Sequence, residues 1–268
     1  MIHYHHRIAL GLAVTIAIAA SCLPAAPAGA IIGGQPDRNG HPYVAAIGQP
    51  DGAGIYFTGT AISPTVVLTA AHAVVRLERL GFTMARLTFD PVVSASSTWY
   101  TGTIHVDPAY DPTNTTNSND LAVIALDAPV TGITPASLPT EGLLDQLASK
   151  GTRAPFDLVG YGISRYTGAA NGGGSPTLDF SSTGTRELAQ ESFSSITSAW
   201  LHLQVNGGAA ACIGDSGAPS LVGGTDVVAG IFILEGSLSG GQCQSQPWDI
   251  RVDTPSARAF LGQYTTLR

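Results

Sequence analysis

Charged residues are scarce in this sequence. Lysine, arginine, aspartate and glutamate make up 12% of its 268 residues, which is about half the share usual in globular proteins. Only 12 charged residues are basic against 19 acidic, and the net charge of -7 excludes the basic surface of a typical nucleic-acid-binding protein. Hydrophobic residues reach 44%, so the chain also lacks the composition of a disordered protein.

Cysteines and long apolar runs are few as well. Three cysteines exclude a dense disulfide framework. After residue 30 no apolar run reaches the length of a transmembrane helix. By contrast, 32 glycines and 17 prolines separate short apolar segments, and this composition is typical of many short strands joined by turns.

The segment 1–30 is predicted to be a secretory signal peptide. Its apolar run Ile8–Ala20 is too short to span a membrane comfortably, and Ala28-Gly29-Ala30 fits a signal-peptidase site. A lipid anchor at Cys22 is the alternative, although the residue three positions earlier is not a large aliphatic one. We therefore expect a secreted protein whose two remaining cysteines, Cys212 and Cys243, form one disulfide.

The rest of the chain predicts an all-β fold. Turn-forming residues separate segments of strand-like composition: Tyr43–Ile47, Ile55–Ile62, Thr65–Thr69, Met84–Phe89, Leu121–Leu126, Asp157–Gly160, Ala199–Gln204 and Val227–Phe232. Thr254 followed by Pro255 predicts the start of a C-terminal helix, and Glu141–Ser149 is a second candidate helix. The pattern alone does not distinguish a β-sandwich from β-barrels.

Four short motifs then follow one another in a particular order. They are Ile31–Gly34 directly after the predicted cleavage site, Ala70-Ala71-His72 at the end of an apolar strand, Asp120 at the start of another, and Gly214-Asp215-Ser216-Gly217 after Cys212. Each motif alone is more often a turn or a structural residue. A chance occurrence of all of them in this order is very improbable.

In this order the motifs resemble those of the chymotrypsin-like (trypsin-fold) serine proteases, whose triad runs His, Asp, Ser along the chain. The resemblance covers residues 31–268, and Val159–Gly162 and the cysteine pair Cys212 and Cys243 also match the family. It implies two six-stranded antiparallel β-barrels and a short C-terminal helix. We expect residues 31–140 to form the N-terminal barrel and residues 141–268 the C-terminal barrel with the helix.

The resemblance also implies roles for individual residues. His72 is the expected general base, Asp120 orients it, and Ser216 is the nucleophile, because a serine hydroxyl needs a nearby base at neutral pH. The backbone N–H groups of Gly214 and Ser216 are the expected oxyanion hole. In the family, the carboxylate beside the nucleophile, here Asp215, pairs with the freed N-terminal amine, here that of Ile31.

The sequence departs from the family at several positions. The cysteines that bracket the histidine are replaced by Thr58 and Ala73, and Ile233 stands where a serine usually supports the triad aspartate. The expected substrate pocket has no acidic residue six positions before the nucleophile. This absence argues against cleavage after lysine or arginine, unless Glu235 or Asp249 reaches the pocket. The expected pocket residues are Ala210, Ala211, Ile213, Leu234, Glu235 and Trp248.

These observations predict a secreted serine endopeptidase that acts on protein or peptide substrates as a monomer, with no cofactor, metal, nucleic acid or transmembrane segment. A non-catalytic secreted binding module on the same fold is the alternative. A secreted esterase of another fold is less favoured, because its nucleophile lies in Gly-x-Ser-x-Gly and Ala218 occupies the last position here.

Overall fold

The computed structural model describes residues 31–52, 55–150, 154–167, 177–233, 243 and 248–267. The predicted signal peptide and two expected pocket residues, Leu234 and Glu235, lie outside the described residues. None of the helices in the described part of the chain has the length and hydrophobicity needed to cross a bilayer.

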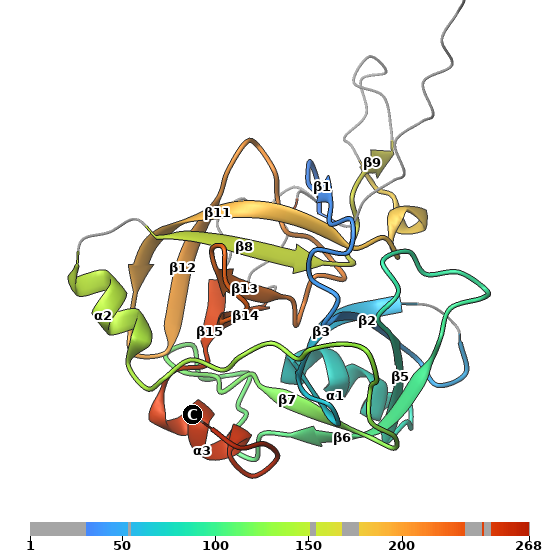
Figure 1. The fold of residues 1–268 in the computed structure, drawn as a ribbon, viewed down its shortest axis with the longest axis horizontal. Helices are drawn as coiled ribbons and strands as arrows, with labels where there is room; N and C mark the ends of the chain where they lie inside the picture. Colours follow the sequence, from blue (N-terminus) through green and yellow to red (C-terminus); the bar gives the residue numbers. More distant parts are fainter. Residues whose placement is uncertain are drawn as a thin grey trace, which may run out of the picture.

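Six antiparallel strands form the first barrel, which closes in the order β2-β3-β4-β7-β6-β5 (Figure 1). Their bounds are β2 Val44–Gly48, β3 Ile55–Ser63, β4 Val66–Thr69, β5 Met84–Thr88, β6 Tyr100–Val106 and β7 Ala122–Leu126. Helix α1, Ala71–Arg79, connects β4 to β5. Each strand of this barrel contributes buried apolar side chains, and these fill the barrel interior.

Six further strands form the second barrel in the order β11-β12-β15-β14-β13-β8, and pairing of β11 with β8 closes it. Their bounds are β8 Pro155–Gly160, β11 Glu187–Ile196, β12 Trp200–Val205, β13 Pro219–Val222, β14 Val228–Ile233 and β15 Trp248–Arg251. The short strand β1, Gln35–Pro36, adds to the edge of β11. The first residues of the described chain therefore lie against the second barrel.

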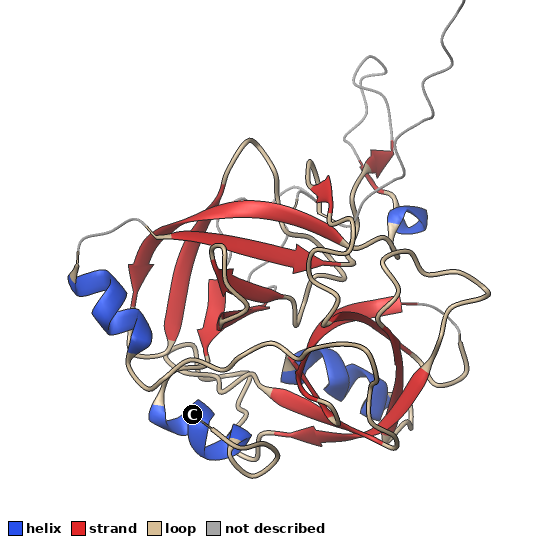
Figure 2. Ribbon diagram, in the orientation of Figure 1, coloured by secondary structure: helices blue, strands red, loops and turns tan. Residues whose placement is uncertain are grey.

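Two of the helices, α2 and α3, lie outside the strands of the two barrels (Figure 2). Helix α3, Pro255–Leu261, begins as predicted, since the side chain of Thr254 accepts a hydrogen bond from the N–H of Ala257. Helix α2, Leu143–Ser149, confirms the second candidate helix. The remaining elements are a two-stranded pair, β9 Tyr166–Thr167 with β10 Thr177–Leu178, and the 3-10 turn η1 Phe180–Ser182.

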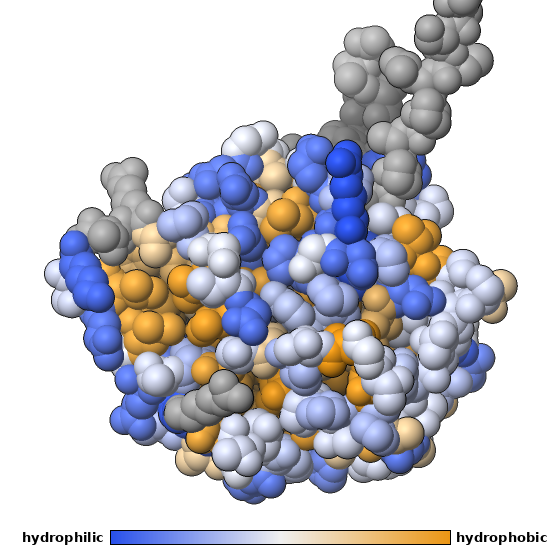
Figure 3. Space-filling view, in the orientation of Figure 1, coloured by the Kyte–Doolittle hydropathy of each residue, from blue (hydrophilic) through white to orange (hydrophobic). Residues whose placement is uncertain are grey.

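Helix α2 covers one end of the second barrel. Its Leu144 is fully buried in a cluster with Phe156, Leu201, Leu203 and Ala229. Partly buried apolar side chains continue this cluster to the surface, and Figure 3 shows apolar surface beside α2 on an otherwise mixed face.

Two carboxyl groups lie inside the second barrel. Glu191 on β11 and Asp249 on β15 are completely buried, and Ser220 on β13 donates to Glu191 Oε2 at 2.9 Å. The other oxygen of Glu191 and both oxygens of Asp249 have no hydrogen-bond partner among the residues the structure describes. Burial raises the pKa of Asp249 to about 7, and burial together with the charge of Asp249 raises that of Glu191 well above its usual range.

This pair predicts that the protein loses stability as the pH rises from about 4 to about 7. The unfolded state releases the proton of Asp249 near the ordinary aspartate pKa, whereas the folded state keeps it up to about pH 7. The free energy of unfolding should therefore fall across this window, and Asp249→Asn should flatten the fall. Urea unfolding of the wild type and of Asp249→Asn at pH 4.5 and pH 7.5 measures how far the stability of each protein falls. An equal fall in the two proteins would contradict the raised pKa of Asp249.

Candidate active site

The two barrels bring together three residues that the sequence motifs singled out. Strands β4 and β7 are paired, with Thr69 opposite Ala122, so the residues that follow β4 and precede β7 meet at one edge of the first barrel. His72 follows β4 in the first turn of α1, and Asp120 precedes β7. Ser216 comes from the second barrel, in the loop between β12 and β13.

These three side chains form a continuous hydrogen-bonded chain. The Nδ1 atom of His72 lies 2.7 Å from Asp120 Oδ2, and its Nε2 atom lies 2.9 Å from Ser216 Oγ. Asp120 and Ser216 are buried, whereas the His72 side chain is 31% exposed. The chain therefore starts in the interior and ends at a hydroxyl beside an imidazole that solvent can reach.

Asp120 also completes the start of helix α1. The first turn of a helix has N–H groups without a partner inside the helix, and Ala70 at the N-cap has no side chain that can accept one. The Oδ1 atom of Asp120 accepts the backbone N–H of His72 at 2.8 Å. One carboxylate thus fixes both the backbone and the ring of His72.

Two unpaired N–H groups flank the serine hydroxyl. The N–H of Asp215 donates to the carbonyl of Cys212 at 3.0 Å. The N–H groups of Gly214 and Ser216, on either side of it, have no acceptor within the described residues. Gly214 has a φ of +98°, a conformation that glycine adopts without strain. Such a pair of free donors can stabilise negative charge that develops on a substrate oxygen.

The carboxylate of Asp215 holds this loop from within. It is fully buried and accepts the N–H of Gly162 through Oδ1 and that of Cys212 through Oδ2, each at 2.9 Å. A Cβ atom on Gly160 would lie 2.1 Å from Oδ1, so glycine there leaves room for the carboxylate. Burial, and to a smaller extent the charge of Glu187, raise the pKa of Asp215 well above its usual range.

Thr58 links the first barrel to the same loop. Its backbone N–H donates to the carbonyl of Ser216 at 2.9 Å, and its Oγ1 donates to the carbonyl of Gly214 at 2.9 Å. The same Oγ1 accepts the N–H of Tyr161 at 3.1 Å. The sequence marked Thr58 only as the site of a missing cysteine, and its hydrogen bonds were not predicted. Ala73, the other such site, is a buried residue of α1.

Ile31 is buried at the edge of the second barrel, where Ile32 and Ala210 exchange backbone hydrogen bonds at 3.1 and 2.8 Å. The sequence predicted a pair between the Ile31 amine and Asp215. In the structure the Ile31 nitrogen donates to Oε2 of Glu187 at 3.0 Å, and no contact with Asp215 is found in the described part of the chain. The predicted pair stays a prediction, and no sequence motif pointed to Glu187.

The expected substrate pocket is only partly described. Ala210 and Ala211 are buried, and Ile213 is half-buried before the nucleophile loop. Trp248 is 42% exposed and packs edge-on against His202, with ring centroids 4.7 Å apart. Ile233 is buried, and its aliphatic side chain has no polar atom that could support a carboxylate as a serine would.

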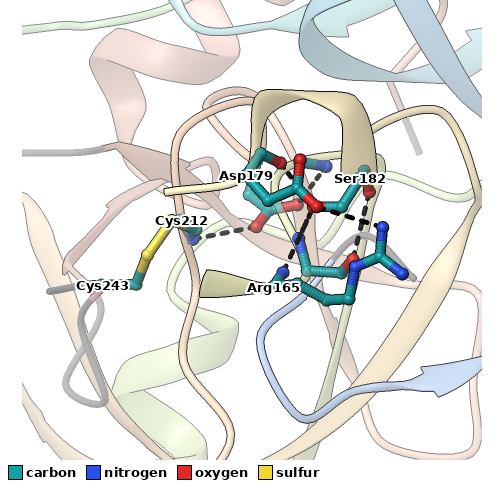
Figure 4. Close-up of a disulfide and its surroundings, with 8 residues drawn as sticks. Arg165, Asp179, Ser182, Cys212 and Cys243 are labelled. Carbon is teal, nitrogen blue, oxygen red and sulfur yellow. Dashed lines mark hydrogen bonds and ion pairs between the residues drawn. A yellow bond between two sulfur atoms is a disulfide. The ribbon is translucent and has the colours of Figure 1, made fainter. Parts of the chain in front are cut away.

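A disulfide joins Cys212 to Cys243, as the sequence predicted, with Cα atoms 4.8 Å apart. Figure 4 shows it near a turn in which Arg165 pairs with Asp179 at 3.1 Å. Within the described residues, no group of three or more histidine, cysteine, aspartate or glutamate side chains is arranged to bind a metal ion.

Comparisons with known proteins agree with this geometry. A family model described as trypsin matches residues 31–260. A solved structure titled HL collagenase has a TM-score of 0.66 and 19% identity over 89% of this chain and 100% of its own. Neuropsin, a serine protease of mouse brain, has a TM-score of 0.60 and 18% identity over 83% of this chain and 94% of its own. These identities support the fold alone. No curated protein is similar enough to this chain to be a match.

The contacts of Thr58 predict that Thr58→Val destabilises the protein by about 1–3 kcal/mol, because a buried acceptor and a buried donor lose their partner. Thr60→Val is the matched control on the same strand. Thr60 is equally buried, but its Oγ1 has no hydrogen-bond partner among the described residues. The free energy of unfolding, measured in urea, should fall more in Thr58→Val than in Thr60→Val. An equal fall in the two variants would show that the hydrogen bonds of the Thr58 hydroxyl add no stability.

Proposed function

The chain belongs to the trypsin family, and on that premise we propose that it is a secreted serine endopeptidase. The observation that supports this proposal most strongly is the hydrogen-bonded chain from Asp120 through His72 to Ser216, with contacts of 2.7 and 2.9 Å. Both contacts are within the range in which a base takes a proton from a nucleophile. A non-catalytic binding module, the alternative, would not require this hydrogen-bonded arrangement of Asp120, His72 and Ser216.

In the proposed reaction, Ser216 Oγ attacks the carbonyl carbon of the scissile peptide bond while His72 Nε2 takes its proton. Asp120 accepts the Nδ1–H of His72, which fixes the tautomer and stabilises the imidazolium as it forms. His72 then gives its proton to the leaving amine, and an acyl-enzyme remains on Ser216. Water, activated by the same histidine, hydrolyses this ester and restores the serine.

The free N–H groups of Gly214 and Ser216 are the proposed oxyanion hole. They donate to the substrate oxygen as it gains negative charge in the tetrahedral intermediate. Removal of one such donor typically costs about 3 kcal/mol of barrier. Thr58 holds this loop through its bond of 2.9 Å to the Gly214 carbonyl, and Asp215 anchors the loop by accepting the N–H of Gly162 at 2.9 Å.

The proposed route to the mature enzyme runs through secretion. Removal of residues 1–30 leaves Ile31 at the N-terminus, in the buried position where the structure has it. The disulfide between Cys212 and Cys243 is consistent with an oxidising compartment. Signal peptidase would then be the only protease that the chain needs for maturation.

The proposal predicts that Ser216→Ala lowers kcat on a peptide substrate by about 10⁴-fold or more, because nucleophile and base act as a unit. Ser256→Ala on the surface of α3 is the control and should keep full activity. Steady-state rates on a denatured protein substrate and on a peptide amide measure both effects. Activity that survives in Ser216→Ala would contradict the proposed nucleophile.

We further propose that the enzyme prefers an apolar residue before the scissile bond. Ala210 lies where a family member that cleaves after basic residues has a carboxylate, and Asp249 faces Glu191 in the barrel interior. Peptides that differ only at this position should be cleaved with kcat/KM about tenfold or more in favour of leucine or valine over arginine. A preference for arginine would instead mean that the carboxylate of Glu235 or Asp249 reaches the substrate.

A further inference from the structure

The nitrogen of Ile31 has a partner that the sequence motifs did not indicate. It lies 3.0 Å from Oε2 of Glu187, in a buried contact between residues far apart in the chain. Ile31 is fully buried and Glu187 is 4% exposed. A charged carboxylate is rarely buried without a compensating donor or cation. The Ile31 nitrogen is therefore one of the groups that stabilise the buried Glu187 carboxylate.

The sheet register brings a second carboxylate to the same place. Glu187 on β11 is directly opposite Gly160 on β8, and opposed residues of an antiparallel pair project from the same face. Gly160 has no side chain, and the carboxylate of Asp215 occupies the space that a side chain there would need. A Cβ atom on Gly34 would come within 2.7 Å of Glu187 Oε2, so glycine leaves room there as well.

The surroundings of the Ile31 nitrogen are otherwise apolar. The side chain of Ile31 belongs to a buried cluster formed by Leu158, Ala189, Val205, Ala209, Ala211, Ala218 and Phe232. Among the described residues, the titratable group in contact with the nitrogen is Glu187 from β11. Asp215, from the nucleophile loop, is close enough to Glu187 for the charge of Glu187 to raise its pKa. Arg186, next to Glu187 in the chain, directs its guanidinium to Asp37 at 2.8 Å.

A positive charge at the Ile31 nitrogen would offset the negative charges of the buried Glu187 and Asp215 carboxylates. Asp215 accepts only backbone N–H groups, and no ion pair of Asp215 is present in the part of the chain that the structure describes. Hydrolysis of the bond between residues 30 and 31 adds the hydroxyl of water to the first product and its hydrogen to the nitrogen. The resulting amine takes a further proton from solvent, and an ammonium group then stands beside Glu187, whose charge also acts on Asp215.

We propose that Glu187 is a positioning residue of this enzyme, the direct acceptor for the α-ammonium group of Ile31, while Asp215 supplies the second negative charge and holds the nucleophile loop. This inference rests on the proposed function, because it assigns how maturation assembles the same active site. Glu187 acts on catalysis through Ile31 and Asp215 and touches no substrate.

The experiment compares the secreted protein, shown by mass spectrometry to begin at Ile31, with Glu187→Gln, Asp215→Asn and Glu141→Gln. Glutamine keeps the size of the side chain and removes its charge. Glu141 is an exposed carboxylate outside the site and is the matched control. Gly34→Ala is a second test variant, since it crowds Glu187 without changing any charge.

The first readout is the rate of reductive methylation of the Ile31 amine in the folded protein. Two carboxylates raise the pKa of the amine, and loss of one should lower it by about one unit. Glu187→Gln should therefore be methylated about tenfold faster than wild type, and Gly34→Ala should also be faster. Glu141→Gln should match wild type.

The second readout is the pH profile of kcat. The ammonium form holds the site together, so activity falls as the pH rises through the pKa of the amine. In Glu187→Gln this alkaline fall should move about one pH unit lower, with KM at pH 6 unchanged. A merely structural role of Glu187 would lower activity at every pH without moving the fall.

Two results would overturn the inference. In the first, Glu187→Gln is methylated at the wild-type rate and keeps the wild-type pH profile, whereas Asp215→Asn changes both the rate and the profile. Asp215 alone would then hold the amine. The other is a mature protein that begins before Ile31. Failure of the proposed function gives a different result. The wild-type protein would then hydrolyse no peptide, but its Ile31 amine would still be methylated more slowly than that of Glu187→Gln.

Discussion

The position of Ser216 depends on hydrogen bonds that hold its loop from both barrels. From the first barrel, Thr58 binds the carbonyls of Gly214 and Ser216. From the second, Asp215 reaches back to the N–H of Gly162, and the N–H of Gly217 donates to a carbonyl of β14. These bonds are buried, so each is expensive to break without a replacement. The 2.9 Å contact with the base and the two free N–H groups exist only while this loop is fixed.

A second network joins the barrels away from the site. Arg186 is almost completely buried, and its guanidinium binds Asp37 and the carbonyl oxygens of Val44 and Phe89, which belong to or adjoin the first barrel. Burial opposes ionisation of Asp37, but hydrogen bonds from His41 and Arg186 lower its pKa to about 2. The Asp37 carboxyl is therefore ionised at neutral pH. Arg186 links the start of β11 in the second barrel to the first barrel, whose His72 reaches Ser216 of the second.

Local signals such as the cap at Thr254 predicted the eight strand-like segments and both candidate helices. The two-barrel arrangement came from the resemblance to the family, because local patterns do not distinguish barrels from a sandwich. The sequence did not predict helix α1, since Ala70 gives no N-cap signal and the capping carboxylate of Asp120 comes from 48 residues away. Strand β11 was also missed, because its polar residues hide the alternation. Glu187 was not recognised either, because its position beside Ile31 depends on β-sheet register, which no sequence motif records.

Chemical labelling of Ser216 tests the central claim most directly, that this fold holds a reactive serine beside a functioning base. The secreted protein would be treated with a fluorophosphonate, and mass spectrometry would locate the adduct and read the N-terminus in the same sample. The account predicts a single adduct on Ser216, an N-terminus at Ile31, and no adduct in His72→Ala on the same timescale. A folded protein that begins at Ile31 and remains unlabelled would contradict it, and the non-catalytic alternative would then be preferred.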